Sequence, residues 1–304
     1  MRETMPLTWG QQTFLPLGLR RRLWQRISHA ALHIALLAVG AAFLLPLLWV
    51  LSTSLKSPSR IFAYPIKWIP DKVVWTNYPD AFDLLKIGNT PALVVFASNT
   101  MLVAVLATLG TVVSCAFVAY SFARLRWPER DFVFSACLAT MMLPGVVTLI
   151  PTFLIYRNLG WIDTFLPLIV PSWFGMSGFF VFLMRQFFLS LPYELEEAAR
   201  IDGASSLRIL WQLVMPLSGP VIATVAIFSF LFHYNEFMGP LIYLSSNDNF
   251  TLALGLRMIQ GRFGDRWPLV MAASMMTIVP PVALFAATQR YFTRGVHLSG
   301  LGGR

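Results

Sequence analysis

Residues of the types used in catalysis are few and widely spaced in this chain. Cys115 and Cys137 form no C-x-x-C pair, and each lies in an apolar run typical of a buried packing thiol. His29 and His33 share one face of a predicted helix, but no carboxylate or thiol accompanies them, so we expect no metal site. The sequence also lacks a G-x-x-x-x-G-K-S/T loop to hold ATP phosphates. We therefore predict that the chain is not an enzyme and that it binds no cofactor itself.

One polar group lies inside an apolar segment, where His233 and Asn235 accompany the acid Glu236. Ionisable side chains within a membrane are costly and usually functional. Glu236 either lines a solute path by accepting hydroxyl hydrogen bonds or braces a partner subunit, and bracing is slightly favoured. Each residue of a possible polar path could equally bond between helices. The candidates for such a path are Asn99, Ser121, Ser135, Thr140, Asn235 and Glu236.

The composition places these residues in a membrane protein. Of the 304 residues, 57% are hydrophobic and 12% are charged, whereas soluble proteins have about 45–50% apolar and about 25% charged residues. So few polar side chains cannot cover a core of this size in water. The net charge of +9 is explained by basic residues that flank spans. No basic stripe with interleaved aromatic residues occurs, so we expect membrane lipid and no nucleic acid as a partner.

Stretches without charged residues locate the helices that must hold the polar groups. Six such stretches exceed twenty residues, and a helix needs about 20 residues to cross about 30 Å of hydrocarbon. We therefore predict an all-α integral membrane protein with six transmembrane helices. The expected spans lie near 30–52, 97–119, 132–155, 164–186, 217–243 and 268–290.

Basic residues predict the orientation of these spans. With the N-terminus inside, the inner segments hold fourteen Arg and Lys residues and the outer segments hold nine, which favours cytoplasmic termini. The expected division is a cytoplasmic tail over 1–29, the first span with an external segment over 30–94, a transmembrane core over 95–290 and a cytoplasmic tail over 291–304. A helical stretch is expected near Tyr78–Leu85 in the external segment.

The inner loop over 188–216 predicts two short helices joined by a turn. Acidic residues follow Pro192 and suit a helix start, Gly203 suits a left-handed helix end, and Ser205 or Ser206 can cap the second helix. An apolar stripe in the second helix comprises Leu207, Leu210, Leu213 and Val214. Such a stripe needs a surface to cover it, which is either a partner protein or the bilayer.

The loop resembles the EAA loop of the permease subunits of ATP-binding cassette importers. The family pattern is Glu-Ala-Ala, three residues, Gly, nine residues and Ile-x-Leu-Pro, and this chain has Glu197-Ala198-Ala199, Gly203 and Leu213–Pro216. The run Glu197–Ala204 is similar to the carbohydrate branch, of the maltose-permease type. Further segments resemble that branch in order along the chain, namely Met142–Pro151, Arg185–Phe188, Tyr234–Phe237, Pro240–Tyr243 and Gln289–Phe292.

The resemblance implies a type-1 importer (MetI-like) fold in the cytoplasmic, or inner, cell membrane. It implies a permease that carries a sugar by alternating access, driven by two copies of a cytoplasmic ATPase that bind ATP and magnesium. It also implies a second homologous permease and an extracytoplasmic sugar-binding protein as partners. The residues that it implies for docking on the ATPase are Glu197, Ala198, Ala199, Arg200, Asp202, Gly203, Leu207, Leu210, Leu213 and Pro216.

Two other classes of membrane protein are weaker alternatives. An ion-coupled secondary transporter predicts inverted repeats and broken helices, but the sequence shows no internal repeat and a single intramembrane acid. A membrane-embedded enzyme predicts a cluster of histidines, carboxylates or thiols, which the sequence also lacks.

Overall fold

The computed structural model describes residues 17–61, 64–65, 67–175 and 177–299, and these are mostly helical. The elements of the N-terminal half are α1 (Leu17–Ser54), η1 (Pro58–Arg60), α2 (Asn77–Phe82), β1 (Lys86–Ile87), β2 (Thr90–Pro91), α3 (Ala92–Arg124), α4 (Arg130–Ala139), η2 (Thr140–Met142) and α5 (Gly145–Asn158). Those of the C-terminal half are α6 (Leu166–Ile169), η3 (Val170–Phe174), α7 (Gly178–Ser190), α8 (Glu194–Ile201), α9 (Ser206–Ile209), η4 (Leu210–Val214), α10 (Met215–Leu217), α11 (Gly219–Asn235), α12 (Met238–Tyr243), η5 (Asn247–Asn249), α13 (Leu252–Phe263) and α14 (Trp267–Ser299).

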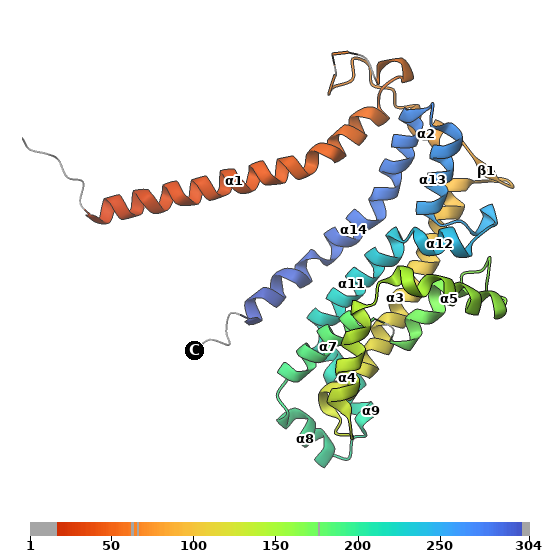
Figure 1. Ribbon diagram of the computed structural model, residues 1–304. Helices are drawn as coiled ribbons and strands as arrows, with labels where there is room; N and C mark the ends of the chain where they lie inside the picture. The colour runs from red at the N-terminus through yellow and green to blue at the C-terminus, as the bar shows by residue number, and fades with distance from the viewer. Residues whose placement is uncertain (1–16, 62–63, 66, 176, 300–304) are drawn as a thin grey trace, which may run out of the picture.

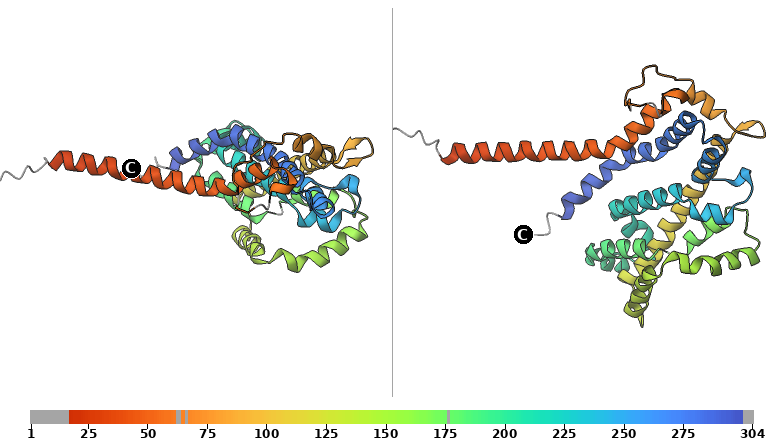
Figure 2. Two further views of the ribbon diagram at one scale, coloured as in Figure 1. Left: turned by 90° about the horizontal axis from the view of Figure 1, so that it is seen from above. Right: turned by 45° about the horizontal axis from the view of Figure 1, so that its top comes forward.

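The helix α3 forms the centre of the bundle. Its small residues Ala104, Ala107, Ala116 and Ala119 are almost fully buried, and small side chains let neighbouring helices approach closely. One apolar cluster joins α3 to α7, α11 and the second loop helix, and a second joins it to α2, α13 and α14. The views in Figures 1 and 2 show α3 passing through this bundle, with α2 at one end and α8 at the other.

The first helix leaves the bundle. The span Trp24–Ser54 buries none of its apolar window inside this chain. The N-terminal part of α1 projects away from the bundle (Figures 1 and 2), while the helix also contacts α14. The helix α1 begins at Leu17, inside the predicted tail over 1–29, and α14 continues to Ser299, inside the predicted tail over 291–304. A helix can extend beyond the hydrocarbon, so both tails stay predictions. Residues 1–16 and 300–304 lie outside the described part of the chain.

Two predicted spans are broken rather than straight. Within the described residues, four helices are long and apolar enough to cross a membrane, and the number rises to six if each of two bent pairs counts as one span. The first pair bends by 98° between Met142 and Gly145, around Pro144. The second bends by 84° at Ser218, between Pro216 and Pro220. Proline removes a backbone donor and kinks a helix, which accounts for the bends in the spans predicted near 132–155 and 217–243.

The external segment folds back on the end of α1. The buried Asn77 amide donates to the carbonyls of Ser54 (2.8 Å) and Lys56 (2.9 Å). Residues 86–91 then form the antiparallel pair β1–β2, which turns the chain into α3. The expected helix near Tyr78–Leu85 is confirmed as α2, although it is shorter and begins at Asn77.

Candidate functional site

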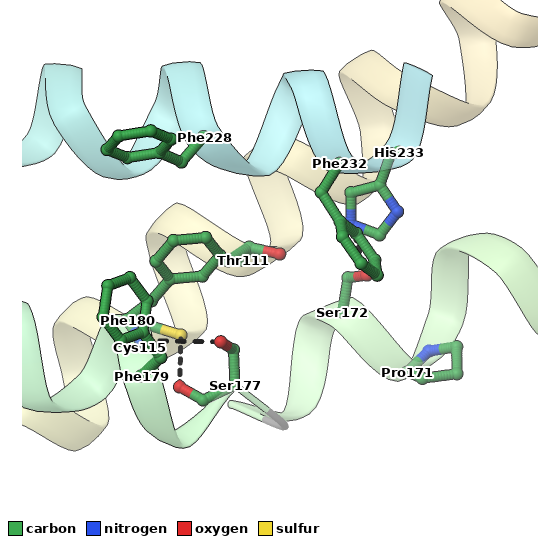
Figure 3. Close-up of a pocket in the computed structure, with 10 residues that line it drawn as sticks. All are labelled: Thr111, Cys115, Pro171, Ser172, Ser177, Phe179, Phe180, Phe228, Phe232 and His233. Carbon is green, nitrogen blue, oxygen red and sulfur yellow. Dashed lines mark hydrogen bonds between the residues drawn. The ribbon is translucent and has the colours of Figure 1, made fainter. Parts of the chain in front are cut away.

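A cavity of about 560 Å³ lies between α3, η3, α7 and α11. Four phenylalanines supply most of its walls, and a few polar groups interrupt them, as is usual in ligand-binding pockets. Figure 3 shows the side chains of α11 facing those of α3 and α7 across this space. The lining residues are Thr111, Cys115, Pro171, Ser172, Ser177, Phe179, Phe180, Phe228, Phe232 and His233.

A second cavity of about 220 Å³ adjoins the first and is more polar at one end. Both cavities are lined by Pro171, Ser172, Phe232 and His233, so these residues form their common wall. The His233 ring lies 3.4 Å from the Ser172 hydroxyl, measured from Nε2 to Oγ. Further polar groups of the second cavity come from Tyr156, Glu236, Tyr243 and Thr251. The arrangement offers hydroxyl, imidazole and carboxylate groups in two adjoining, largely apolar cavities.

Glu236 lies at the break between α11 and α12. The backbone turns extended at this residue, and the carboxylate accepts a 2.9 Å hydrogen bond from the Gly239 backbone N–H. That bond satisfies one of the free N–H groups at the start of α12, and Glu236 lines the second cavity. Of the two roles considered for Glu236, lining a cavity therefore fits the geometry of this chain.

A clasp centred on Asp163 lies beside the second cavity, which Tyr243 lines. The Asp163 N–H donates to the carbonyl of Tyr243 (2.7 Å), and the Asp163 carboxylate accepts the backbone N–H groups of Ser245 and Ser246, each at 2.9 Å. The Ser246 hydroxyl and the Asn249 amide also donate to it. The hydroxyl and backbone N–H of Ser246 lower the pKa of Asp163 most, far below its ordinary value. The loop before α6 is thus tied to the loop after α12.

A glycine fixes the wall that α3 and η3 share. A Cβ atom at Gly110 would lie 2.5 Å from Cδ1 of the Trp173 ring, which is too close for any real contact. The indole therefore packs directly on the α3 backbone. Next to it, the Ser114 hydroxyl donates to the Ser172 carbonyl (2.9 Å). These contacts set the width of the larger cavity.

Most of the predicted path residues do not meet at the cavities. Asn99 donates to the carbonyls of Asp248 and Phe250 and thus holds the loop before α13. The hydroxyls of Ser135 and Thr140 donate to carbonyls of their own helical turns, outside the cavity walls. Ser121 lies on α3 away from both cavities, and Asn235 lines a separate hollow beside α14. Of the six, Glu236 lines the second cavity.

The sequence analysis missed most of the lining residues. Thr111, Ser172 and His233 sit in apolar runs where isolated polar residues have no distinctive spacing. His233 was singled out only as a neighbour of Glu236, and the spacing of three residues between them was the available signal, because in a helix it places both on one face.

The inner loop forms the predicted pair of short helices, α8 and α9. Gly203 has a φ of +78°, the left-handed conformation expected at the end of α8. The Ser205 hydroxyl accepts the Arg208 N–H at 3.4 Å and caps α9. The helix pair lies at the end of the bundle opposite α2 (Figure 1), and Glu197, Ala198 and Asp202 are exposed on it.

The apolar stripe of the second helix is only partly available for docking. Leu210 and Val214 are each 1% exposed and belong to this chain's own core, and Leu213 packs against that core. The predicted docking role of Leu210 is therefore wrong, and only Leu207, at 56% exposed, faces outward. Ile201, the last residue of α8, is 86% exposed. The sequence analysis overlooked it, because it is not part of an apolar stripe at helical spacing.

Comparison with known proteins assigns the chain to a family. Residues 112–297, more than half of the chain, match the binding-protein-dependent transport system inner membrane components. The chain belongs to this family. Its solved structural neighbours include a bacterial ABC transporter involved in the import of alginate, which aligns with a TM-score of 0.73 and 22% identity over 92% of this chain and 100% of the other. The type-1 importer fold predicted from the resemblance is confirmed.

Curated relatives are permease proteins of similar length. The sn-glycerol-3-phosphate transport system permease protein UgpE of Yersinia enterocolitica is 32% identical over 87% of this chain and 94% of its own length. The sulfoquinovosyl glycerol transport system permease protein SmoH of Agrobacterium fabrum is 33% identical over 86% of this chain and 89% of its own. The predicted role as a permease subunit of an ATP-binding cassette importer, in the carbohydrate branch, is confirmed.

Proposed function

We propose that this permease passes a sugar or sugar-like polyol through the two adjoining cavities beside the Asp163 clasp. The proposal rests on the lining of these cavities, which combines phenylalanine rings with hydroxyl, imidazole and carboxylate groups. A sugar presents C–H faces that pack on aromatic rings and hydroxyls that need hydrogen-bond partners. Among the described residues, no Lys or Arg lines either cavity. The hydroxyl-bearing part of the cargo therefore suits this subunit better than an anionic group.

The proposed complex contains three further kinds of component. A binding protein delivers the cargo from outside the cell, and one of the structural neighbours is an alginate transporter in complex with a periplasmic protein that carries an alginate pentasaccharide. A second homologous permease completes the path. Two ATPase subunits bind magnesium and ATP and dock on the exposed side of α8, near Glu197 and Ile201. This arrangement places both termini of the chain in the cytoplasm.

The proposal is tested with the complex in proteoliposomes. With binding protein outside and ATP inside, we expect accumulation of a radiolabelled sugar that stops when ATP is omitted. Uptake that persists without the ATPase, or that a proton or sodium gradient alone drives, would refute the importer mechanism and support the ion-coupled alternative.

A matched pair of threonines on α3 tests the path. Thr111 lines the larger cavity, whereas Thr108 is buried one turn away and lies outside both linings. Replacing Thr111 by Val removes one hydrogen-bonding hydroxyl at constant volume, worth about 0.5–1.5 kcal/mol, so half-saturation of uptake should need about 2–10 times more cargo. Thr108→Val serves as the control and should leave uptake unchanged. Equal effects of the two substitutions would contradict this path.

A further inference from the structure

The loop helix α8 is joined to the central helix α3 by a buried ion pair. The Nε atom of Arg124, the last residue of α3, lies 3.1 Å from Oε1 of Glu196. The two side chains are 5% and 2% exposed. A charge is buried to this degree only when it is paired, so the pair is built into the fold and is not a surface contact.

Arg124 also contacts the end of α7 and the residues that connect α7 to α8. Its Nη2 donates to the carbonyl of Leu191 at 2.6 Å and to the carbonyl of Phe188. Its guanidinium group lies 5.8 Å from the ring centroid of Tyr193. One side chain of α3 therefore fastens the end of α7, the connecting residues and the first turns of α8.

The pair is held by charge and not by hydrogen bonds. Both Glu196 oxygens lack a hydrogen bond in the described structure, since the Arg124 N–H does not point along the 3.1 Å contact. The other nearby cation is Arg200, whose Nη2 lies 3.9 Å from Oε2 and whose side chain is 42% exposed. Burial raises the pKa of Glu196, and the two arginines oppose that shift. A non-directional contact of this kind keeps its attraction when α8 tilts by a small amount.

The same helix leads directly to the larger cavity. Cys115 lines that cavity and lies nine residues before Arg124 on α3, a distance of about 14 Å at 1.5 Å per residue. No break interrupts α3 between them. A displacement applied at Arg124 is therefore carried along a continuous helix to the cavity wall.

We propose that Arg124 and Glu196 are positioning residues that make α8 and α3 move as one body, so that motion of the docked loop reaches the cavity wall. The inference rests on the proposed function and adds the connection within the permease. Glu197 remains exposed for the ATPase, while its neighbour Glu196 points inward. Adjacent acids thus serve opposite faces of α8.

The distance between α8 and α3 gives a test that needs no cargo. Nitroxide labels are placed at Asp202, on the tip of α8, and at Val105, on the exposed side of α3, with Cys115 and Cys137 replaced by alanine. In the assembled complex we expect the same label distance with and without ATP, and an ATP-dependent change in the Glu196→Gln variant. An ATP-dependent change already present before that substitution would overturn the proposal.

Uptake per ATP hydrolysed supplies the second readout. For Glu196→Gln we expect retained ATPase binding and hydrolysis but uptake lowered about tenfold or more, in the range of typical coupling energies. Arg124→Lys keeps the charge and should lose less. Glu194→Gln makes the same change at an exposed position of α8 and should change neither activity.

The outcomes separate the two proposals. Loss of ATPase binding in both Glu196→Gln and Arg124→Lys would show that the pair has only a structural role. Unchanged uptake per ATP in both variants would show that the pair does not transmit motion from α8 to α3. Failure of the proposed function appears differently, as absent ATP-dependent uptake by the unsubstituted complex, while the label distances still report whether α8 and α3 move together.

Discussion

Removal of the Asp163 carboxylate should loosen the connection between the loop before α6 and the loop after α12. Asp163 has a φ of +61°, a left-handed conformation that Asp, Asn and Gly tolerate and other residues resist. Asp163→Gly therefore deletes the side chain without adding backbone strain, and Asp163→Asn keeps the shape while removing the charge. The two substitutions separate the contributions of hydrogen bonding and of charge.

The size of the effect follows from the donors that would be lost. Two backbone N–H groups, one hydroxyl and one amide donate to the carboxylate. Hydrogen bonds to charged groups contribute about 1.5–3 kcal/mol each, and neutral ones about half of that. Because the clasp is partly exposed and its bonds are not additive, we expect Asp163→Gly to cost about 3–4 kcal/mol and Asp163→Asn about 1–2 kcal/mol.

Thermal unfolding of the purified complex in detergent measures this loss. The order of melting temperatures should be unsubstituted protein, then Asp163→Asn, then Asp163→Gly. The pKa of Asp163 is lowered in the folded state, so its stabilisation is present in full above the unfolded value of about 3.9 and is lost as the pH falls further. The advantage over Asp163→Asn should therefore be constant from about pH 5 to 8 and shrink below about pH 4.

The reasoning fails if the charge does not matter. Equal melting temperatures for Asp163→Asn and the unsubstituted protein at neutral pH would show that shape alone closes the clasp. A loss below about 1 kcal/mol in Asp163→Gly would show that water replaces the missing acceptor.

Three further substitutions test the loop and the cavity wall. Gly203→Leu forces a side chain into a left-handed turn at a cost of about 1–2 kcal/mol. We expect this variant to insert normally into the membrane but to lose ATP-dependent uptake. Gly40→Leu, at an exposed position of α1, is the control and should not change uptake in the same assay. Glu197→Arg reverses an exposed charge of α8 and should weaken co-purification of the ATPase; unchanged co-purification would remove Glu197 from the docking surface. Gly110→Ala should cost about 1–3 kcal/mol by overpacking on Trp173, and the loss in melting temperature should be smaller when Trp173 is also replaced by Leu.

The sequence predicted the elements of the fold better than their shapes. Gaps between charges depend on the cost of burying ions in lipid, which is large, so every predicted span contains a helix or a bent pair. The sizes of the bends at Pro144 and Ser218 were not predicted, because a proline in a membrane helix produces a kink whose size depends on the neighbouring helices. The reach of α1 back to Leu17 was missed because amphipathic and charged residues extend a helix without leaving a charge gap.

The candidate site was predicted unevenly for a similar reason. The turn at Gly203 and the cap at Ser205 are local and were correct. The inward side of α8 was missed, since Glu196 and Glu197 look alike in sequence and only packing against Arg124 distinguishes them. The same holds for the cavity, whose walls come from four separated segments.

The isolation of α1 bears on how the protein is made and retained. A ribosome releases this helix before any of the bundle, and the bundle buries none of its apolar window. The exposed part of α1 can therefore be solvated by lipid and insert before α3 to α14 are made, and its contacts with α14 form later. The nascent chain is then held in the plane of the membrane by α1, and the later helices pack together next to a helix that is already inserted.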